Sequence, residues 1–255
     1  MLGAIAGDII GSRFEVIPTK SFDFQLFTEL STFTDDTVMT VAIAEAILYN
    51  QPYEDKLREY GRRYPDAGYG SSFIRWLSGV IPGPYNSYGN GSAMRVSPVG
   101  FAFSSEEDVL EEARKSAEVS HNHPEGIKGA QAIALSVFLA RQGFSKKHIR
   151  QTIETRFGYD LSRKLREIRP QYQFEVSCQR SVPESIIAFL EADDFVSAIR
   201  NAVSLGGDSD TMACMAGAIA HAYYKDVPRA VCEAVYARLP EAFKKILIVF
   251  EEHYL

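Results

Sequence analysis

The chain has 255 residues, 46% of them hydrophobic, which is enough for one large domain or two small ones with a real core. A formal net charge of −6 and the absence of a long basic run argue against a nucleic-acid partner. No stretch reaches the roughly 18–20 apolar residues of a membrane span, and the first residues lack the basic start of a signal sequence. The three cysteines have no Cys-x-x-Cys spacing. We therefore expect a soluble, cytoplasmic protein without a zinc site or disulfides.

Apolar residues recur along the chain at helical spacing, without a convincing succession of alternating strands. The predicted helices span residues 2–12, 35–50, 53–63, 70–79, 106–118, 125–141, 145–156, 183–191, 194–204, 210–224, 228–238 and 240–252. Pro183 and Pro228 are assigned to first helical turns, which tolerate proline. The irregular segments 80–104 and 158–182 are too long for plain connectors, so at least one should be a functional loop. Because no linker divides the chain, we expect one all-α domain over residues 1–255, built as a compact orthogonal multi-helix bundle.

Three of these segments, "LGAIAGDIIG", "TVMTVAIAEAIL" and "TMACMAGAIAHAYY", are apolar on nearly every side and rich in small residues. Helices without a polar face belong in the middle of a protein. We therefore expect these three helices at the centre of the bundle.

Two acidic sequences precede the second and third of these apolar helices. They are "TDDT" and "GGDSDT", and their side chains are Thr34, Asp35, Asp36, Asp208, Asp210 and Thr211. Each sequence alone is typical of a helix N-cap, which needs only one such oxygen. If the two helix ends meet, several carboxylates share a small space and repel one another. Bound hard divalent cations usually offset such repulsion. Oxygen ligands without cysteine favour Mg²⁺ or Mn²⁺, and the alternative is that some of the aspartates hold protons.

Glu15 and Asp8 add two more acids near the first apolar helix. Gly11 and Ser12 predict the end of that helix, which would leave Glu15 beyond it and facing a cleft. There a free carboxylate is a candidate for acid/base chemistry. Asp8 lies inside the apolar stretch, where we expect it to bond backbone or hydroxyl groups as structural support.

The loop "YNSYGNGSAMRVSP" has the glycines and amides of a possible anion-binding turn, although most Gly-Asn-Gly turns bind nothing. Arg95 in this loop could bind phosphate or brace the loop. His121 and His123 are either metal ligands or hydrogen-bonding groups. His221, inside an apolar helix, is expected to be a core histidine.

The segments "GAIAGDIIGSRFE", "FTDDTVMTVAIAEAIL", "YGNGSAMRVSPVG" and "SHNHPEGIKGAQAIA", together with the run from "CQRSVPES" to "GGDSDTMACMAGAIAHAYY", resemble the ADP-ribosylglycohydrolase family. This family includes the dinitrogenase-reductase-activating glycohydrolases. The segments follow the family's order over residues 3–224, and the two acidic sequences together are highly specific. The resemblance implies an all-α fold that holds two Mg²⁺ or Mn²⁺ ions and hydrolyses the glycosidic bond between ADP-ribose and an acceptor side chain.

The resemblance also implies a role for each matching residue. The implied metal ligands are Thr34, Asp35, Asp36, Asp208, Asp210 and Thr211, although Asp208 could instead orient the others. The implied catalytic residues are Glu15, Asp35 and Asp210, with Glu15 near the scissile bond. Gly89, Asn90, Gly91 and Ser92 would lie along the diphosphate, and His121 near the ribose or phosphates. By analogy with bacterial relatives, arginine is the first choice of acceptor.

Cleavage at the distal ribose develops oxocarbenium character, which a carboxylate and a placed water assist. The expected partner is an ADP-ribosylated protein or a small molecule that contains ADP-ribose, and the expected oligomeric state is a monomer. One alternative is a nucleosidase or phosphoester hydrolase that acts on a free nucleotide. Another is a non-catalytic ADP-ribose-binding protein.

Overall fold

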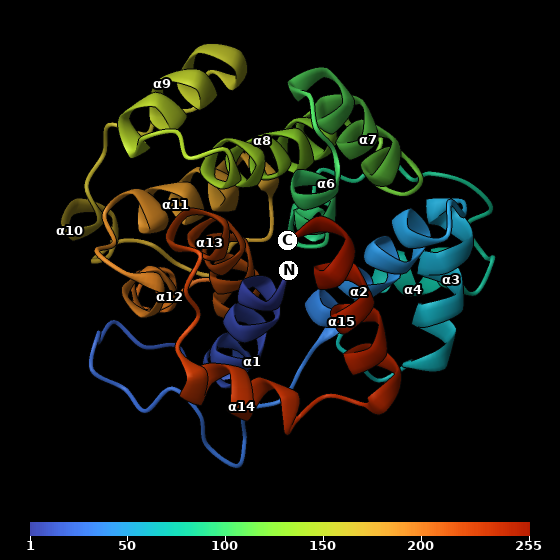
Figure 1. Cartoon of the computed structure of the whole chain (residues 1–255), viewed down its shortest axis with the longest axis horizontal. Helices are drawn as coiled ribbons and strands as arrows, with labels where there is room; N and C mark the ends of the chain where they lie inside the picture. The colour runs from blue at the N-terminus through green and yellow to red at the C-terminus, as the bar shows by residue number, and fades with distance from the viewer.

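The computed structural model describes residues 1–255 as helices joined by loops, with one isolated bridge between Gly89 and Ser177 in place of a sheet. The predicted all-α fold is confirmed (Figure 1). The helices are α1 (Leu2–Val16), α2 (Asp35–Leu48), α3 (Tyr53–Arg63), α4 (Ser71–Leu77), α5 (Gly91–Met94), α6 (Ser97–Ala102), α7 (Glu106–Glu118), α8 (Pro124–Arg141), α9 (Lys146–Phe157), α10 (Leu165–Ile168), α11 (Cys178–Leu190), α12 (Phe195–Val203), α13 (Ser209–Tyr224), α14 (Arg229–Tyr236) and α15 (Glu241–Tyr254). No helix is long and apolar enough to cross a membrane.

Helices α1 and α13 lie side by side near the centre of the molecule and share its most extensive helix contact (Figure 1). They run antiparallel, because Gly7 meets Ala213 while Gly11 meets Asp210 and Ser209. A Cβ on Gly7 would lie 2.0 Å from the Ala213 oxygen, and one on Gly11 would lie 2.5 Å from the Asp210 Cα. Only glycine allows this close approach. It brings the C-terminal end of α1 beside the N-terminal end of α13.

The three apolar helices are buried along most of their length, as expected. Helix α2 packs against α1 on one side and against α3 and α15 on the other. Helices α8, α11 and α12 surround the remaining faces of α13. One continuous apolar core extends from Met1 to Phe250.

Several predicted boundaries are wrong. Helix α1 continues through Gly11 and Ser12 to Val16, because Gly11 serves the contact with α13 and does not end the helix. Helix α11 begins at Cys178, so Pro183 lies inside it and not in its first turn. The carbonyl that Pro183 leaves without a donor belongs to the exposed Gln179, where water can replace the missing bond. The segment 80–104, expected to be irregular, contains α5 and α6.

Candidate functional site

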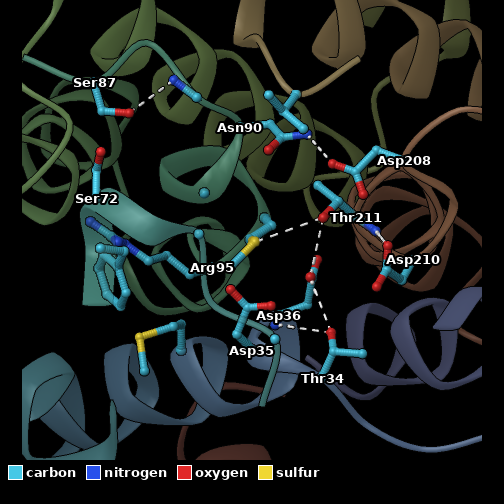
Figure 2. Close-up of a pocket in the computed structure, with 18 of the residues that line it drawn as sticks. Thr34, Asp35, Asp36, Ser72, Ser87, Asn90, Arg95, Asp208, Asp210 and Thr211 are labelled. Carbon is cyan, nitrogen blue, oxygen red and sulfur yellow. Dashed lines mark hydrogen bonds between the residues drawn. The ribbon is translucent and has the colours of Figure 1, made fainter. Parts of the chain in front are cut away.

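The two acidic sequences meet, although they lie more than 170 residues apart along the chain. The Thr211 hydroxyl donates to Asp36 Oδ2 at 3.1 Å and so joins the start of α13 to the start of α2 (Figure 2). Both helix N-termini therefore point into one site, beside the last turn of α1. Their dipoles favour negative charge there.

We call the six carboxylates at this junction the acidic cluster; they are Asp8, Glu15, Asp35, Asp36, Asp208 and Asp210. Carboxylate oxygens of Asp8, Asp36 and Asp210 lie within 4.8 Å of one another, and the same holds for Glu15, Asp208 and Asp210. Every ion pair of the protein lies elsewhere, so no lysine or arginine neutralises the cluster. The cluster is an uncompensated concentration of negative charge.

This concentration raises the pKa values of its members. Burial, followed by the charges of Asp8 and Asp208, raises the pKa of Asp35 to about 8. Burial and neighbouring carboxylates also raise the pKa values of Asp36 and Asp210 well above the usual range. Without a cation, these shifts favour protonation of the cluster, which is the alternative that the sequence left open.

Helix capping does not account for these side chains. Thr34 is the N-cap of α2, and its hydroxyl accepts from the Asp36 amide at 3.4 Å, which leaves Asp35 and Asp36 free for another role. Asp208 occupies the N-cap position of α13 without capping it, because its carboxylate accepts from the Asn90 side chain at 2.8 Å. Asp36 Oδ1 is buried and has no hydrogen-bond partner. A buried carboxylate oxygen without a donor, surrounded by further carboxylates and hydroxyls, suits a hard divalent cation.

Asp8 has the supporting role that we expected. Its carboxylate accepts from the backbone amides of Thr34 at 3.0 Å and Thr37 at 3.1 Å, and also from the hydroxyls of both threonines. Burial raises its pKa to about 6 against the opposing effect of these bonds. Asp8 therefore fixes the start of α2 on α1.

Glu15 lies within the last turn of α1, not beyond the helix end as predicted. Because α1 runs on, Glu15 and Asp8 lie seven residues apart on one helical face, and both point toward the other acids. Burial, followed by Asp208 and Asp8, raises the pKa of Glu15. Its side chain is the most exposed of the cluster and lines the cavity beside it.

A cavity of about 430 Å³ opens from the acidic cluster. Its wall contains Thr34, Asp35, Asp36, Asp208, Asp210 and Thr211 together with Glu15, and also Gly89, Asn90, Gly91 and His121. The Asn90 side chain joins the two groups through its bond to Asp208. Ser92 does not reach the cavity, because its hydroxyl donates to the Gly126 oxygen at 2.7 Å behind the loop. Apart from the Ser92 side chain, the predicted site residues share this one cavity.

Arg95 lines the cavity and also ties the glycine loop, residues 85–98, to the end of α7 and the residues that follow it. Its guanidinium is buried and donates to the Ser116 oxygen at 2.8 Å and to the Ser120 hydroxyl at 2.9 Å. His123 caps α8 by accepting from the Glu125 amide, so it is not part of a metal site. His221 is a core histidine that bonds the Met1 amino group and the Gly3 amide.

Two loops complete the cavity with residues that we did not predict. Segment 67–73 is held over the site by the bond from the Asp35 amide to the Ala67 oxygen, 2.8 Å long. Segment 172–176 contributes Phe174 and Val176. The main-chain oxygen of Val176 accepts from the backbone amide of Asn90 at 2.7 Å. The unusual length of the segment 158–182 was the only sequence signal for this wall.

A second cavity of about 290 Å³ adjoins the first and shares Glu15 and Phe174 with it. Its other lining residues are Pro18, Lys20, Tyr172, Gln173, Gly206 and Gly207. The Lys20 ammonium group donates to the main-chain oxygen of Tyr172 at 2.6 Å and also to the main-chain oxygen of Leu205. This cavity therefore has a cation on its wall and adjoins the first cavity at Glu15.

Comparison with known proteins agrees with this geometry. The family model of ADP-ribosylglycohydrolase matches residues 1–254. The chain belongs to the ADP-ribosylglycohydrolase family. It is 30% identical to ADP-ribosylhydrolase ARH3 of Mus musculus, and the alignment covers 88% of this chain and 82% of that protein. It is 29% identical to ADP-ribosylhydrolase ARH3 of Homo sapiens, over 88% of this chain and 84% of that protein.

A solved structure described as an ADP-ribosylglycohydrolase-related protein complex has the same fold. Its TM-score to this chain is 0.75 at 24% identity, and the match covers 100% of this chain and 97% of the other. The protein is thus an enzyme of a glycohydrolase family, with the family's fold over its whole length.

Proposed function

We propose that the protein hydrolyses the glycosidic bond between ADP-ribose and an acceptor side chain, and so releases ADP-ribose. The observation that carries this proposal is that one cavity is lined both by carboxylates of the acidic cluster and by the Gly89–Gly91 turn. A nucleoside diphosphate-ribose can place its diphosphate along the turn and its distal ribose among the acids. The bond to be cleaved then lies next to Glu15.

We propose two Mg²⁺ or Mn²⁺ ions in the cluster, held by Thr34, Asp35, Asp36, Asp208, Asp210 and Thr211. The unpartnered Asp36 Oδ1, the oxygen-only donor set and the absence of ion pairs fit such ions. When bound, the ions would offset the negative charge and supply Lewis acidity toward ribose hydroxyls and water.

The protein's own groups orient the reactants and move protons. Glu15 has a raised pKa and stands at the edge of the cavity, so it can hold a proton and pass it to the departing acceptor atom. Asp35 and Asp210 orient the ribose and the attacking water, and one of these carboxylates takes the proton that the water loses as Glu15 gives its own to the acceptor. The Thr34 hydroxyl bonds Asp8 and the Thr211 hydroxyl bonds Asp36, which fixes the starts of α2 and α13 that carry Asp35 and Asp210.

The acceptor leaves on the Glu15 side, toward the second cavity. The analogy with bacterial relatives favoured an arginine acceptor. Lys20 favours a second candidate, because its positive charge on that wall disfavours a guanidinium and suits an uncharged hydroxyl acceptor such as serine. The two candidates predict different relative rates of ADP-ribose release from arginine-linked and serine-linked peptides.

The test is the release of ADP-ribose from arginine-linked and serine-linked model peptides with Mg²⁺, with Mn²⁺ and with a chelator. We expect release with metal, faster from the serine-linked peptide, and none with the chelator. In the Lys20→Ala variant, the rates of ADP-ribose release from the two peptides should differ less than in the wild type. Release at full rate in the chelator, or hydrolysis only of free nucleotides, would contradict the proposal. Binding of ADP-ribose without turnover of either peptide would point instead to a non-catalytic binding protein.

We further propose that the enzyme acts as a monomer in the cytoplasm. All three cysteines are free, which fits a reducing compartment. Light scattering of the purified protein and fractionation of the source cells test these two statements.

A further inference from the structure

His121 is held in an unusual way at the wall of the cavity. Its side chain is almost fully buried, and its Nδ1 lies 2.8 Å from the Ser120 hydroxyl. Its Nε2 bonds no protein group and lies against the glycine loop, 3.0 Å from where a Cβ on Gly91 would stand. One ring nitrogen is therefore fixed by the protein, and the other is presented at the turn that lines the cavity.

The Ser120 hydroxyl connects His121 to Arg95. The hydroxyl oxygen accepts a hydrogen bond from the Arg95 guanidinium at 2.9 Å, and a guanidinium can only donate. Ser120 is fully buried, so its own O–H needs an acceptor within the protein. His121 Nδ1 is the only other polar atom that bonds this hydroxyl.

This arrangement decides which ring nitrogen carries the proton. If Nδ1 carried it, the Ser120 oxygen would receive two donors and its own proton would have no acceptor. If Nδ1 is unprotonated, it accepts the Ser120 proton while the Ser120 oxygen accepts from Arg95, and the neutral ring carries its proton on Nε2. Arg95 is also the charged group that faces this ring, and together with burial it lowers the pKa of His121 well below its usual range.

We propose that Arg95 and Ser120 are positioning residues that hold His121 as a neutral imidazole with its proton on Nε2, where it donates to an oxygen of bound ADP-ribose. The identity of this ligand rests on the proposed function, whereas the position of the ring proton does not. A neutral donor gives directional recognition of a phosphate or ribose oxygen. It adds no charge to a site whose electrostatics are set by the acids and their cations.

The direct test is the ¹⁵N NMR spectrum of the histidine rings in the free protein at pH 7, with the His121→Gln variant to assign the signals. We expect His121 to show the pattern of the neutral tautomer protonated on Nε2. A pattern of the Nδ1-protonated tautomer or of the imidazolium ion would overturn the proposal. This result is independent of whether ADP-ribose is the ligand.

The Ser120→Ala variant tests the connection. We expect a mixture of His121 tautomers and about five- to tenfold weaker binding of ADP-ribose by calorimetry, the loss expected for one hydrogen bond. The matched control is Ser136→Ala, which removes another fully buried hydroxyl, bonded to the Ala132 oxygen within α8. It should leave both the tautomer and the affinity unchanged.

Wild-type tautomer and affinity in Ser120→Ala, or an equal loss in both variants, would show that the connection has no positioning role. If the wild-type protein bound no ADP-ribose but His121 still showed the expected tautomer, the proposed function would fail while the positioning by Arg95 and Ser120 would stand.

Discussion

At the scale of single residues, the site depends on carboxylates that repel one another. Asp36 is buried, accepts from Thr211, and keeps one oxygen without any partner. Asp210 accepts only the amide of its neighbour, Thr211, at 2.9 Å. Such a cluster costs folding free energy unless cations or protons neutralise it. A cluster of this cost is better explained by function than by stability, and its residues were predictable because "TDDT" and "GGDSDT" carry more oxygens than helix capping requires.

The Asp210→Asn variant separates the functional value of this charge from its cost. We expect turnover to fall by at least about 100-fold, since a proposed ligand and catalytic group is lost. In a chelator, the variant should melt at a higher temperature than the wild type, because an asparagine can be buried without the cost of protonating a carboxylate. Asp226→Asn changes an exposed aspartate near the other end of α13 and should alter neither quantity. Wild-type turnover by Asp210→Asn would refute the assignment.

The raised pKa values predict how the metal-free protein responds to pH. The pKa of Asp35 is about 8 and that of Asp8 about 6 in the folded state, both above the usual 3.8. The folded state therefore binds more protons than the unfolded state, so this stabilisation is complete below about pH 4 and is lost as the pH rises to about 8.

Urea denaturation in a chelator should show the free energy of unfolding falling by at least about 1 kcal/mol between pH 5 and pH 8. The decline should be shallower in Asp35→Asn. A free energy that stayed constant or rose over this range would mean that the carboxyls are not protonated in the folded protein.

At the scale of helices, the site depends on how closely α1 approaches α13. The sequence predicted both helices and their central position, since neither has a polar face. It did not predict where α1 ends, because a glycine that ends a helix and a glycine that admits a neighbouring helix look alike in sequence. Gly11 is of the second kind, and α1 consequently carries Glu15 to the acids of α13.

Gly11→Ala should therefore damage both stability and activity. The added Cβ would meet backbone atoms of Asp210 at 2.5 Å, which cannot move without displacing α13. We expect a loss of about 1–3 kcal/mol in the free energy of unfolding and a drop in turnover as Glu15 and Asp210 move apart. Gly83→Ala is the control, because a Cβ there meets nothing within 4 Å. Equal stability and activity in the two variants would show that the close approach is not required.

At the scale of the whole molecule, the sequence allowed us to predict that the two acidic sequences meet, but not the shape of the cavity beside them. Helical periodicity and residue type indicated that two helix ends meet. The walls formed by segments 67–73 and 172–176 have no periodicity, and their positions depend on single backbone bonds such as those of Asp35 and Asn90. The second cavity with Lys20 likewise follows from tertiary packing alone.

Binding of cations should stabilise the entire fold, because the cluster joins α1, α2 and α13. Adding Mn²⁺ to the metal-free protein at about 100 times its dissociation constant should raise the free energy of unfolding by about 2.7 kcal/mol for one site. Calorimetric scans with and without Mn²⁺ measure this, and Asp36→Asn should respond much less. If the melting temperature of the wild type were the same with and without Mn²⁺, this would argue against a resident metal.

The most direct test of the account is anomalous X-ray diffraction from crystals grown with Mn²⁺, measured at the manganese absorption edge. We expect two anomalous peaks among the side chains of Asp36, Asp208 and Asp210, with Asp36 Oδ1 within bonding distance of one of them. Strong diffraction with no peak at these carboxylates in saturating Mn²⁺ would contradict it.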